Sequence, residues 1–184
     1  MILNYRFSER RRLMALQLKR LDIDMKGALD DFIAGWKDEE IIPSTLQKYT
    51  GDIDEFLAQL DTLENDPPRL MVPGTLLFLT EEEEILGAYE VRHFLNSGLM
   101  KYGGHIGYGV APKHRGNGYA ARMIEMSMPL LKELNLDKVL VCCVSDNVAS
   151  AKSILNAGGV LENEVEIIRN NQPKIGQRYW IDIK

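Results

Sequence analysis

Hydrophobic and polar residues follow two different periods along this chain, and each period predicts one kind of element. Apolar residues at every second position or in short runs predict strands, and apolar residues three and four positions apart predict helices. The predicted strands are residues 13–21, 75–80, 85–94, 102–110, 138–144, 160–169 and 175–183. The predicted helices are 25–37, 52–64, 116–134 and 147–156. This order predicts an α/β fold in which a central sheet of mixed direction carries helices on both faces.

Three local features refine this prediction. Pro129 lies inside the helix predicted for 116–134, and we expect it to bend or divide that helix because proline has no N–H to donate. The run Glu81-Glu82-Glu83-Glu84 separates two predicted strands and should form the solvated tip of a hairpin. The stretch 42–74 is the most irregular part of the chain, so it is the natural place for a segment that shapes a substrate site.

The overall charge and the apolar runs narrow the class of protein. The chain has 184 residues, a formal net charge of −5 and a pI of about 5.3. A mildly acidic protein is a poor candidate for non-specific nucleic-acid binding, which needs a basic face. No apolar run approaches the ~20 residues of a membrane span, and no signal-peptide core is present. We therefore expect a cytoplasmic protein that binds neither nucleic acid nor membranes.

The length suits one domain. Residues 1–12 resemble a loose leader, residues 13–184 are interpreted as a single domain, and Met14 is an alternative start. The two cysteines, Cys142 and Cys143, are adjacent, so a disulfide between them would be strained and packing on a buried strand is the expected role. Because no zinc-ligand spacing occurs either, we predict no metal site.

The chemistry is concentrated in a turn rich in glycine. A predicted strand ends at Val110, and a proline and two glycines (Gly116 and Gly118) then precede a predicted helix. Glycine allows positive φ and close approach of a ligand to the backbone, and a helix begins with unpaired N–H groups and a positive dipole end. This combination predicts an anion site, most often for phosphate. Arg115 could add a charge-assisted contact.

Two common phosphate motifs do not fit this turn. No G-x-x-x-x-G-K-[ST] run occurs, which excludes a P-loop. A dinucleotide fingerprint needs G-x-G-x-x-G, and Gly116-Asn117-Gly118 is followed by Ala121 at the third glycine position. The run from Arg115 to Ala120 instead matches R-x-x-G-x-A, which resembles the pyrophosphate loop of the GNAT superfamily of N-acetyltransferases.

Two further segments carry this resemblance, which covers residues 13–184 and is strongest over 102–184. Asn147-Val148-Ala149-Ser150 follows a buried strand and is similar to the N-x-x-[SA] helix start of the superfamily. The last strand, with Arg178-Tyr179-Trp180-Ile181, is similar to that of a bacterial branch of predicted acetyltransferases. The resemblance implies the acyl-CoA N-acyltransferase fold, with a mostly antiparallel sheet.

The resemblance also implies a set of ligand contacts. Backbone N–H groups of the turn should hold the pyrophosphate of acetyl-CoA, and an amide of Gly109 or Val110 should polarise the thioester carbonyl. Asn147 should meet the pantetheine arm, with Ser150 near the thiol. The implied cofactor-binding residues are Tyr108, Gly109, Val110, Arg115, Gly116, Asn117, Gly118, Tyr119, Ala120, Asn147 and Ser150.

The catalytic groups depart from the superfamily pattern. Many members place a tyrosine, acting as general acid, where this chain has Ile154, so Ser150, Tyr108 or water takes that role, or no acid is needed. Members with a glutamate base on the glycine-rich strand have it where this chain has Gly104. Its neighbour His105 is the candidate base, because its unperturbed pKa is ~6.5. The alternative is that His105 forms a hydrogen bond across the sheet and holds the strands apart.

The predicted function is transfer of the acetyl group from acetyl-CoA to a primary amine, by direct attack in a ternary complex. The alternatives are a catalytically weak or inactive acyl-CoA-binding module and an unrelated enzyme of nucleotide phosphates. The expected acceptor is a small-molecule or peptide amine. Acidic residues in 26–74 could line its site and favour a cationic acceptor. The alternative is that these residues form solvated helix faces. His93 and His114 are expected to be surface or structural residues. A reactive thiol near CoA is the alternative for the cysteines, and paired sheet edges could form a homodimer.

Overall fold

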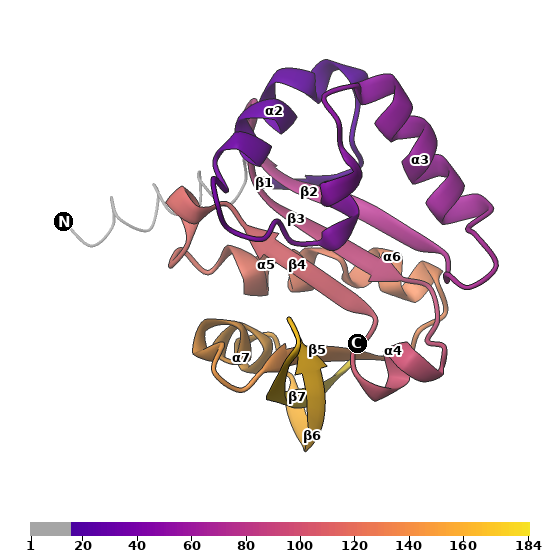
Figure 1. Cartoon of the computed structure of the whole chain (residues 1–184), viewed down its shortest axis with the longest axis vertical. Helices are drawn as coiled ribbons and strands as arrows, with labels where there is room; N and C mark the ends of the chain where they lie inside the picture. Colours follow the sequence, from indigo (N-terminus) through magenta and orange to yellow (C-terminus); the bar gives the residue numbers. More distant parts are fainter. Residues whose placement is uncertain (1–15) are drawn as a thin grey trace.

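Seven strands of the described residues, 16–184, form one sheet in the computed structural model (Figure 1). The leader predicted for 1–12 and the start of the strand predicted from residue 13 lie outside these residues. The sheet order is β1-β2-β3-β4-β5-β7-β6, and only β4 and β5 are parallel neighbours. The predicted mixed, mostly antiparallel sheet is therefore confirmed. The strands are β1 (Leu16–Lys19), β2 (Gly74–Glu81), β3 (Glu84–Arg92), β4 (Ile106–Val110), β5 (Lys138–Val144), β6 (Val160–Arg169) and β7 (Gln172–Asp182).

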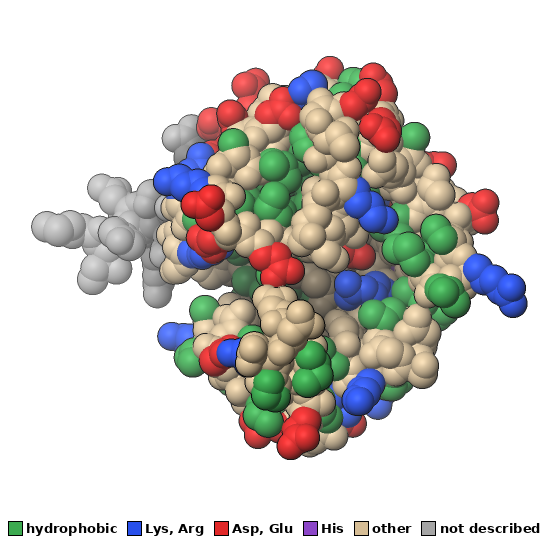
Figure 2. Space-filling view, in the orientation of Figure 1, with side chains coloured by type: hydrophobic (Ala, Val, Ile, Leu, Met, Phe, Trp, Pro, Cys, Tyr) green, Lys and Arg blue, Asp and Glu red, His purple; other side chains and the backbone are tan. Residues whose placement is uncertain are grey.

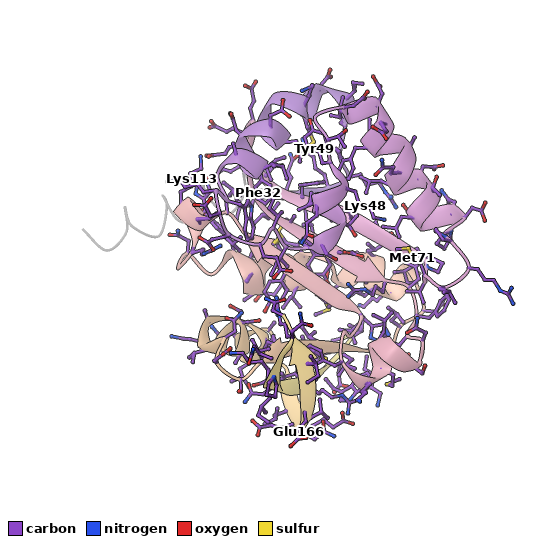
Figure 3. All side chains as sticks on the ribbon, in the orientation of Figure 1. Phe32, Lys48, Tyr49, Met71, Lys113 and Glu166 are labelled. Carbon is purple, nitrogen blue, oxygen red and sulfur yellow. The ribbon has the colours of Figure 1, made fainter. Side chains whose placement is uncertain are left out.

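Helices cover both faces of this sheet, as predicted. On one face, α2 (Lys26–Ala34) and α3 (Ile53–Asn65) bury a core that includes Phe32, Phe56 and Phe78. Figure 3 places Phe32 and Tyr49 in this layer. On the other face, the second core includes residues of α5 (Tyr119–Met126), α6 (Met128–Glu133) and α7 (Val148–Asn156). The shorter helices are η1 (Ile23–Met25), η2 (Ser44–Lys48), α4 (Ser97–Lys101) and η3 (Pro112–His114).

The helix predicted for 116–134 is divided into α5 and α6 at Ser127, next to Pro129. Proline cannot donate to the carbonyl four residues earlier, so the helical ladder is interrupted there. The Ser127 hydroxyl donates to the carbonyl oxygen of Ile124 at 2.8 Å and lies 2.7 Å from the Tyr89 hydroxyl. The predicted effect of Pro129 is thus confirmed. The hydrogen bond between Ser127 and Tyr89 joins the helix break to β3 within the buried core.

The strand predicted for 102–110 is shorter than expected, because β4 begins only at Ile106. Asn96 caps α4 by accepting a hydrogen bond from the N–H of Leu99, so a helix occupies 97–101. Gly104 then has φ +70°, and a Cβ there would lie 2.4 Å from the carbonyl oxygen of Leu140. Only glycine fits this close approach of two backbones, which delays the start of the strand.

The acidic hairpin tip is solvated, as predicted, but it is also tied down. Glu82 and Glu83 are exposed between β2 and β3. Glu84 forms an ion pair with Lys113 and a hydrogen bond with His114, whose Nε2 lies 3.0 Å from Glu84 Oε1. His93 is held by the Thr75 hydroxyl at 2.8 Å. These contacts support the structural roles expected for both histidines.

Candidate active site

A gap opens in the sheet between β4 and β5. The two strands are paired only at Ile106 and Val141, and they diverge beyond that point. The opposite edge of β4 stays paired with β3 from Ile106 to Val110, so the gap lies on one side of β4 alone. Figure 2 shows the surface hollowed at this level, with charged side chains of both signs inside the hollow. An extended ligand could therefore lie along the main chain of β4.

A glycine cradle lies at the end of β4, between η3 and α5. Gly116 and Gly118 have φ +82° and +77°, and a Cβ on either would meet nothing within 4 Å. Gly118 is the N-cap of α5 and no side chain caps this helix. Asn117 Nδ2 donates to the carbonyl oxygen of His114 at 2.9 Å and fixes the turn. The structure thus presents unpaired helix-start N–H groups to open space, which is the geometry of an anion site.

The predicted loop residues contribute unequally to this cradle. Within residues 16–184, the N–H groups of Gly116, Asn117 and Gly118 donate to no other residue. Tyr119 and Ala120 form the first turn of α5, where Tyr119 is buried. The Arg115 N–H is used instead in a 3.4 Å bond to the carbonyl oxygen of Pro112.

The Arg115 side chain does not reach into the cradle. Its Nη1 lies 2.8 Å from Glu39, its Nε donates to the carbonyl oxygen of Val110 at 3.2 Å, and its guanidinium stacks on Trp36. The predicted charge-assisted contact with a phosphate stays a prediction, and it would require this side chain to leave those partners. Arg115 instead fixes the end of β4 to the loop that follows α2.

Tyr108 and Ser150, which are 42 residues apart, meet across the gap. The Tyr108 hydroxyl lies 2.9 Å from Ser150 Oγ and donates to the Ser150 carbonyl oxygen at 3.3 Å. Burial raises the pKa of Tyr108 to about 12, against a smaller lowering by the Ser150 hydrogen bond. The phenol therefore keeps its proton at neutral pH and can serve as a proton donor.

Asn147 has a capping role at the start of α7. Its Oδ1 accepts a hydrogen bond of 3.0 Å from the N–H of Ser150, so a ligand would have to use Nδ2. Four residues after Ser150, Ile154 is fully buried in the core beneath the gap. A Cβ on Gly159 would lie 2.5 Å from Ile154 Cγ2, so the two residues are packed together. The position that often carries a catalytic tyrosine is thus a packing position here.

His105 lies where β4 and β5 are still joined. The main-chain N–H of His105 donates to the Leu140 carbonyl oxygen at 2.7 Å, and the ring Nδ1 accepts a hydrogen bond from the main-chain N–H of Leu140 at 2.9 Å. Burial lowers the pKa of His105 to about 4, with a further contribution from Arg92. A buried, neutral ring with Nδ1 already engaged is poorly placed to accept a proton from an amine. The contacts support the cross-sheet alternative and argue against the base hypothesis.

This contact predicts a pH dependence of stability. Because the pKa of His105 is lower in the folded state than the ~6.5 of the unfolded chain, its contribution is complete above pH 6.5 and is lost as pH falls toward 4. His105→Asn keeps an acceptor near the position of Nδ1 but cannot be protonated. We expect the wild type to lose about 2 kcal/mol more than the variant between pH 7 and pH 4.5, measured by thermal unfolding. Identical pH dependence, or a hundredfold loss of turnover at unchanged stability, would contradict the structural role.

A charged group that the sequence motifs did not single out lies on the other face of the sheet. Glu90 of β3 is buried at 5% exposure, and the Thr45 hydroxyl donates to its Oε2 at 3.0 Å. Glu90 lies opposite Gly107 of β4, and Arg92 Nη2 is 3.9 Å from Glu90 Oε1. A buried carboxylate is costly unless it is paired or hydrogen-bonded, and Thr45 and Arg92 are the groups that meet this need here. The signal was available as two charges, two positions apart, in an apolar strand.

Glycines open this face of β4. A Cβ on Gly107 would lie in ordinary van der Waals contact, 3.9 Å from the Arg92 guanidinium and Pro43, so there is room for a methyl group above Gly107. Gly109 is different, because a Cβ there would lie 2.2 Å from the carbonyl oxygen of Ile42. The loop before η2 therefore covers Gly109 and leaves Gly107 as the floor of a small space.

Three further findings in residues 16–184 concern the cysteines, metal binding and membrane spanning. Burial raises the pKa of Cys143 to about 11, which supports a packing role. Residues 16–184 contain no group of three or more His, Cys, Asp or Glu side chains that could hold a metal ion. No helix in that same part of the chain is long and apolar enough to cross a bilayer.

Comparison with known proteins agrees with this geometry. The acetyltransferase (GNAT) domain family matches residues 20–160, whereas no curated protein matches the chain. Among solved structures, ribosomal-protein-S5-alanine acetyltransferase from Vibrio fischeri has a TM-score of 0.69 at 14% identity, covering 92% of this chain and 94% of its own. The microcin C7 self-immunity acetyltransferase, solved with acetyl-CoA and AMP, has a TM-score of 0.68 at 16% identity, covering 92% and 93%.

Spermidine N-acetyltransferase from Vibrio cholerae, a dodecamer, has a TM-score of 0.63 at 17% identity and covers 92% of this chain and 94% of its own. At such identities these likenesses show the fold, and the family match adds the kind of enzyme. The seven-stranded sheet, the gap between β4 and β5 and the glycine cradle are consistent with both. The chain belongs to the GNAT family of acetyltransferases.

Proposed function

We propose that this acetyltransferase moves the acetyl group of acetyl-CoA to a primary amine, by direct attack of the amine within a ternary complex. The observation that carries the proposal is the open glycine cradle beside the unpaired edge of β4. Acetyl-CoA supplies the activated acetyl group as a thioester. A similar fold has been solved with acetyl-CoA bound, in the microcin C7 self-immunity acetyltransferase.

The cradle and the strand edge would divide the work of holding acetyl-CoA. Main-chain N–H groups of Gly116, Asn117 and Gly118 suit the diphosphate, because the start of α5 adds a positive dipole end. The gap beside β4 suits the extended pantetheine arm. An amide of Gly109 or Val110 would then polarise the thioester carbonyl, a contact whose removal costs ~3–4 kcal/mol in other enzymes.

Tyr108 would act as the proton donor to the departing thiolate. It occupies the gap with its hydroxyl hydrogen-bonded to Ser150, and its pKa of about 12 keeps the proton available. Ser150 would hold the phenol in position. Together the two residues would take the role of general acid, for which many members of the superfamily use a tyrosine at the position of Ile154. A free thiol has a pKa of ~8.5, below that of the phenol, so Tyr108 would stabilise the departing thiolate mainly by a hydrogen bond and its contribution would be modest.

Glu90 would act as the base, in place of His105. An alkylammonium must lose a proton before it attacks, and a positioned base typically contributes ~10²–10⁴-fold. Glu90 Oε2 is held by Thr45, while Oε1 lies 3.9 Å from Arg92 Nη2 and 3.7 Å from the position of a Cβ on Gly74 of β2. The space above Gly107 is where an amine would lie between this carboxylate and the end of β4.

The acidic residues of 26–74 give little support for a polyamine-like acceptor. Asp30, for example, forms an ion pair with Lys26 at 2.6 Å and a hydrogen bond with Tyr49. Asp52 is the N-cap of α3. These two side chains already have partners within the protein, in α2, at Tyr49 and at the start of α3, which favours the solvated-face alternative.

The proposed function is tested by calorimetry with CoA together with an acetyl-CoA-dependent amine screen that detects the free thiol. We expect CoA binding and turnover of at least one amine. Tyr108→Phe should lower turnover about tenfold or more while CoA affinity stays within about twofold, since it removes one proton donor. Absence of CoA binding at millimolar ligand would exclude the proposal. CoA binding without turnover of any amine would instead indicate an acyl-CoA-binding module.

A further inference from the structure

We propose that the acceptor carries an anionic group beside its amine and that Arg92 binds this group; the inference rests on the proposed acetyl transfer and names its acceptor class. The Arg92 side chain is only 20% exposed. Its guanidinium lies 3.3 Å from the carbonyl oxygen of Gly104, 3.5 Å from that of Gly103 and 3.9 Å from Glu90 Oε1. Charge-assisted bonds are usually about 2.7–2.9 Å long, so this largely buried cation has only weak partners.

A second arginine on the same face provides a comparison. Arg178 of β7 is 12% exposed, and its Nη1 lies 2.8 Å from Glu162 and 3.1 Å from Asn163 Oδ1. Arg178 therefore already has a carboxylate at full ion-pair distance, whereas Arg92 has none. An arginine presents five N–H donors in a planar fork that matches a carboxylate or phosphate. Of these two arginines, Arg92 is thus the one without a close carboxylate, although Arg178 keeps a buried Nε that has no hydrogen-bond partner.

The register of β3 and β4 orders the reacting groups. Ala88 pairs with Gly109 and Glu90 with Gly107, while the Arg92 N–H donates to the His105 carbonyl oxygen. Successive same-face residues of a strand are about 6–7 Å apart. Three groups therefore follow one another along β3. The first is the position opposite Gly109, where the thioester would end, the second is the base Glu90 and the third is the cation Arg92. An amine held by Glu90 lies between the reacting carbonyl and the anion-binding group.

The charges and the space fit a small zwitterion. Glu90 and Arg92 form a pair of opposite charges 3.9 Å apart, and an ammonium and an anion joined by one or two carbons can lie against them with reversed polarity. Pro43 and the Arg92 guanidinium bound the space over Gly107 at 3.9 Å from the position of a Cβ, which favours a compact ligand. A carboxylate and a phosphate both match the guanidinium fork, so an α-amino acid and an aminoalkyl phosphate are the two sources of this chemistry.

Matched acceptor pairs test the inference. L-Alanine is compared with ethylamine, and phosphoethanolamine with ethanolamine, by the rate of CoA release from acetyl-CoA at a range of acceptor concentrations. We expect kcat/KM to be at least about tenfold higher for the anionic member of one pair, since hydrogen bonds to charged groups are the strong ones. The pair that shows the difference identifies the source as carboxylate or phosphate. Equal rates within both pairs, or faster turnover of the members without an anionic group, would overturn the proposal.

Variants assign the preference to Arg92. In Arg92→Met the ratio within the preferred pair should fall toward one, while Arg92→Lys should keep part of it because the charge remains. Arg20→Met is the matched control: Arg20 pairs with Glu64 instead, so its loss should leave the ratio unchanged. An unchanged ratio in Arg92→Met contradicts the assignment. If that variant does not fold, the wild-type ratio and Arg92→Lys decide.

A binding measurement separates failure of this inference from failure of the proposed function. Calorimetry is done with L-alanine and phosphoethanolamine on the CoA-saturated protein. Binding of either that weakens at least about tenfold in Arg92→Met supports the anion site even without turnover. A protein that binds CoA and acetylates only amines without an anionic group overturns the anion site alone. A protein that does not bind CoA overturns the proposed function itself.

Discussion

Gly118→Asp should lower the affinity for CoA by at least about a hundredfold and leave the fold intact. The substitution adds a carboxylate where a Cβ would point into open space, on the side that the diphosphate would fill. Two like charges about 4 Å apart near a protein surface repel each other by roughly 4 kcal/mol, which is more than a hundredfold change in affinity needs. Isothermal titration with CoA measures the effect, and thermal unfolding confirms that the variant is folded.

Gly118→Asn is the control that separates charge from backbone strain. Gly118 has φ +77°, a left-handed conformation that asparagine and aspartate tolerate better than other non-glycine residues. The two variants therefore share the same strain and nearly the same shape. We expect Asn to weaken CoA binding far less than Asp. Equal affinity in the two variants would mean that no phosphate lies against residue 118, and the cradle would lose its proposed role.

The glycine cradle could be predicted because its signal is local. Positive φ at Gly116 and Gly118 and an uncapped helix start at Tyr119 are written in consecutive residues. The division of the helix at Pro129 is local in the same sense, since one missing N–H decides it. The side chain of Arg115 was harder to place, because its partners Glu39 and Trp36 come from a distant loop.

The acceptor face could not be predicted, because it depends on contacts between distant segments. Glu90 looks like a polar interruption of an apolar strand until the register places it opposite Gly107 and a loop brings Thr45 above it. His105 looked suited to catalysis because of its unperturbed pKa, but its cross-sheet bonds with Leu140 and its burial change that reading. A pattern within one strand gives the face of a residue but not its partners.

Glu90→Gln should lower turnover by ~10²–10⁴-fold at neutral pH, the usual contribution of a positioned base. Glutamine keeps the shape of the side chain and can still accept the hydrogen bond from Thr45, but it cannot take a proton from an ammonium. CoA affinity should stay unchanged, because Glu90 lies on the opposite face from Tyr108 and away from the cradle. The measurement is steady-state kinetics with the best amine found in the screen.

The pH dependence of the variant distinguishes a base from a structural carboxylate. An alkylamine has a pKa of ~10.4. Below this pH, the fraction of the amine that is neutral in solution rises about tenfold with each unit by which the pH is raised. If Glu90 removes the proton, the deficit of Glu90→Gln should shrink steadily as pH is raised from 7 to 9.5. Glu84→Gln is the control at an exposed carboxylate of the hairpin tip, and it should keep wild-type turnover at every pH. If the loss of turnover in Glu90→Gln stays constant across this range, Glu90 is not the base. The loss would then come from the uncompensated charge of Arg92 beside a neutral residue 90. The acceptor amine would lose its proton to another group or to solvent.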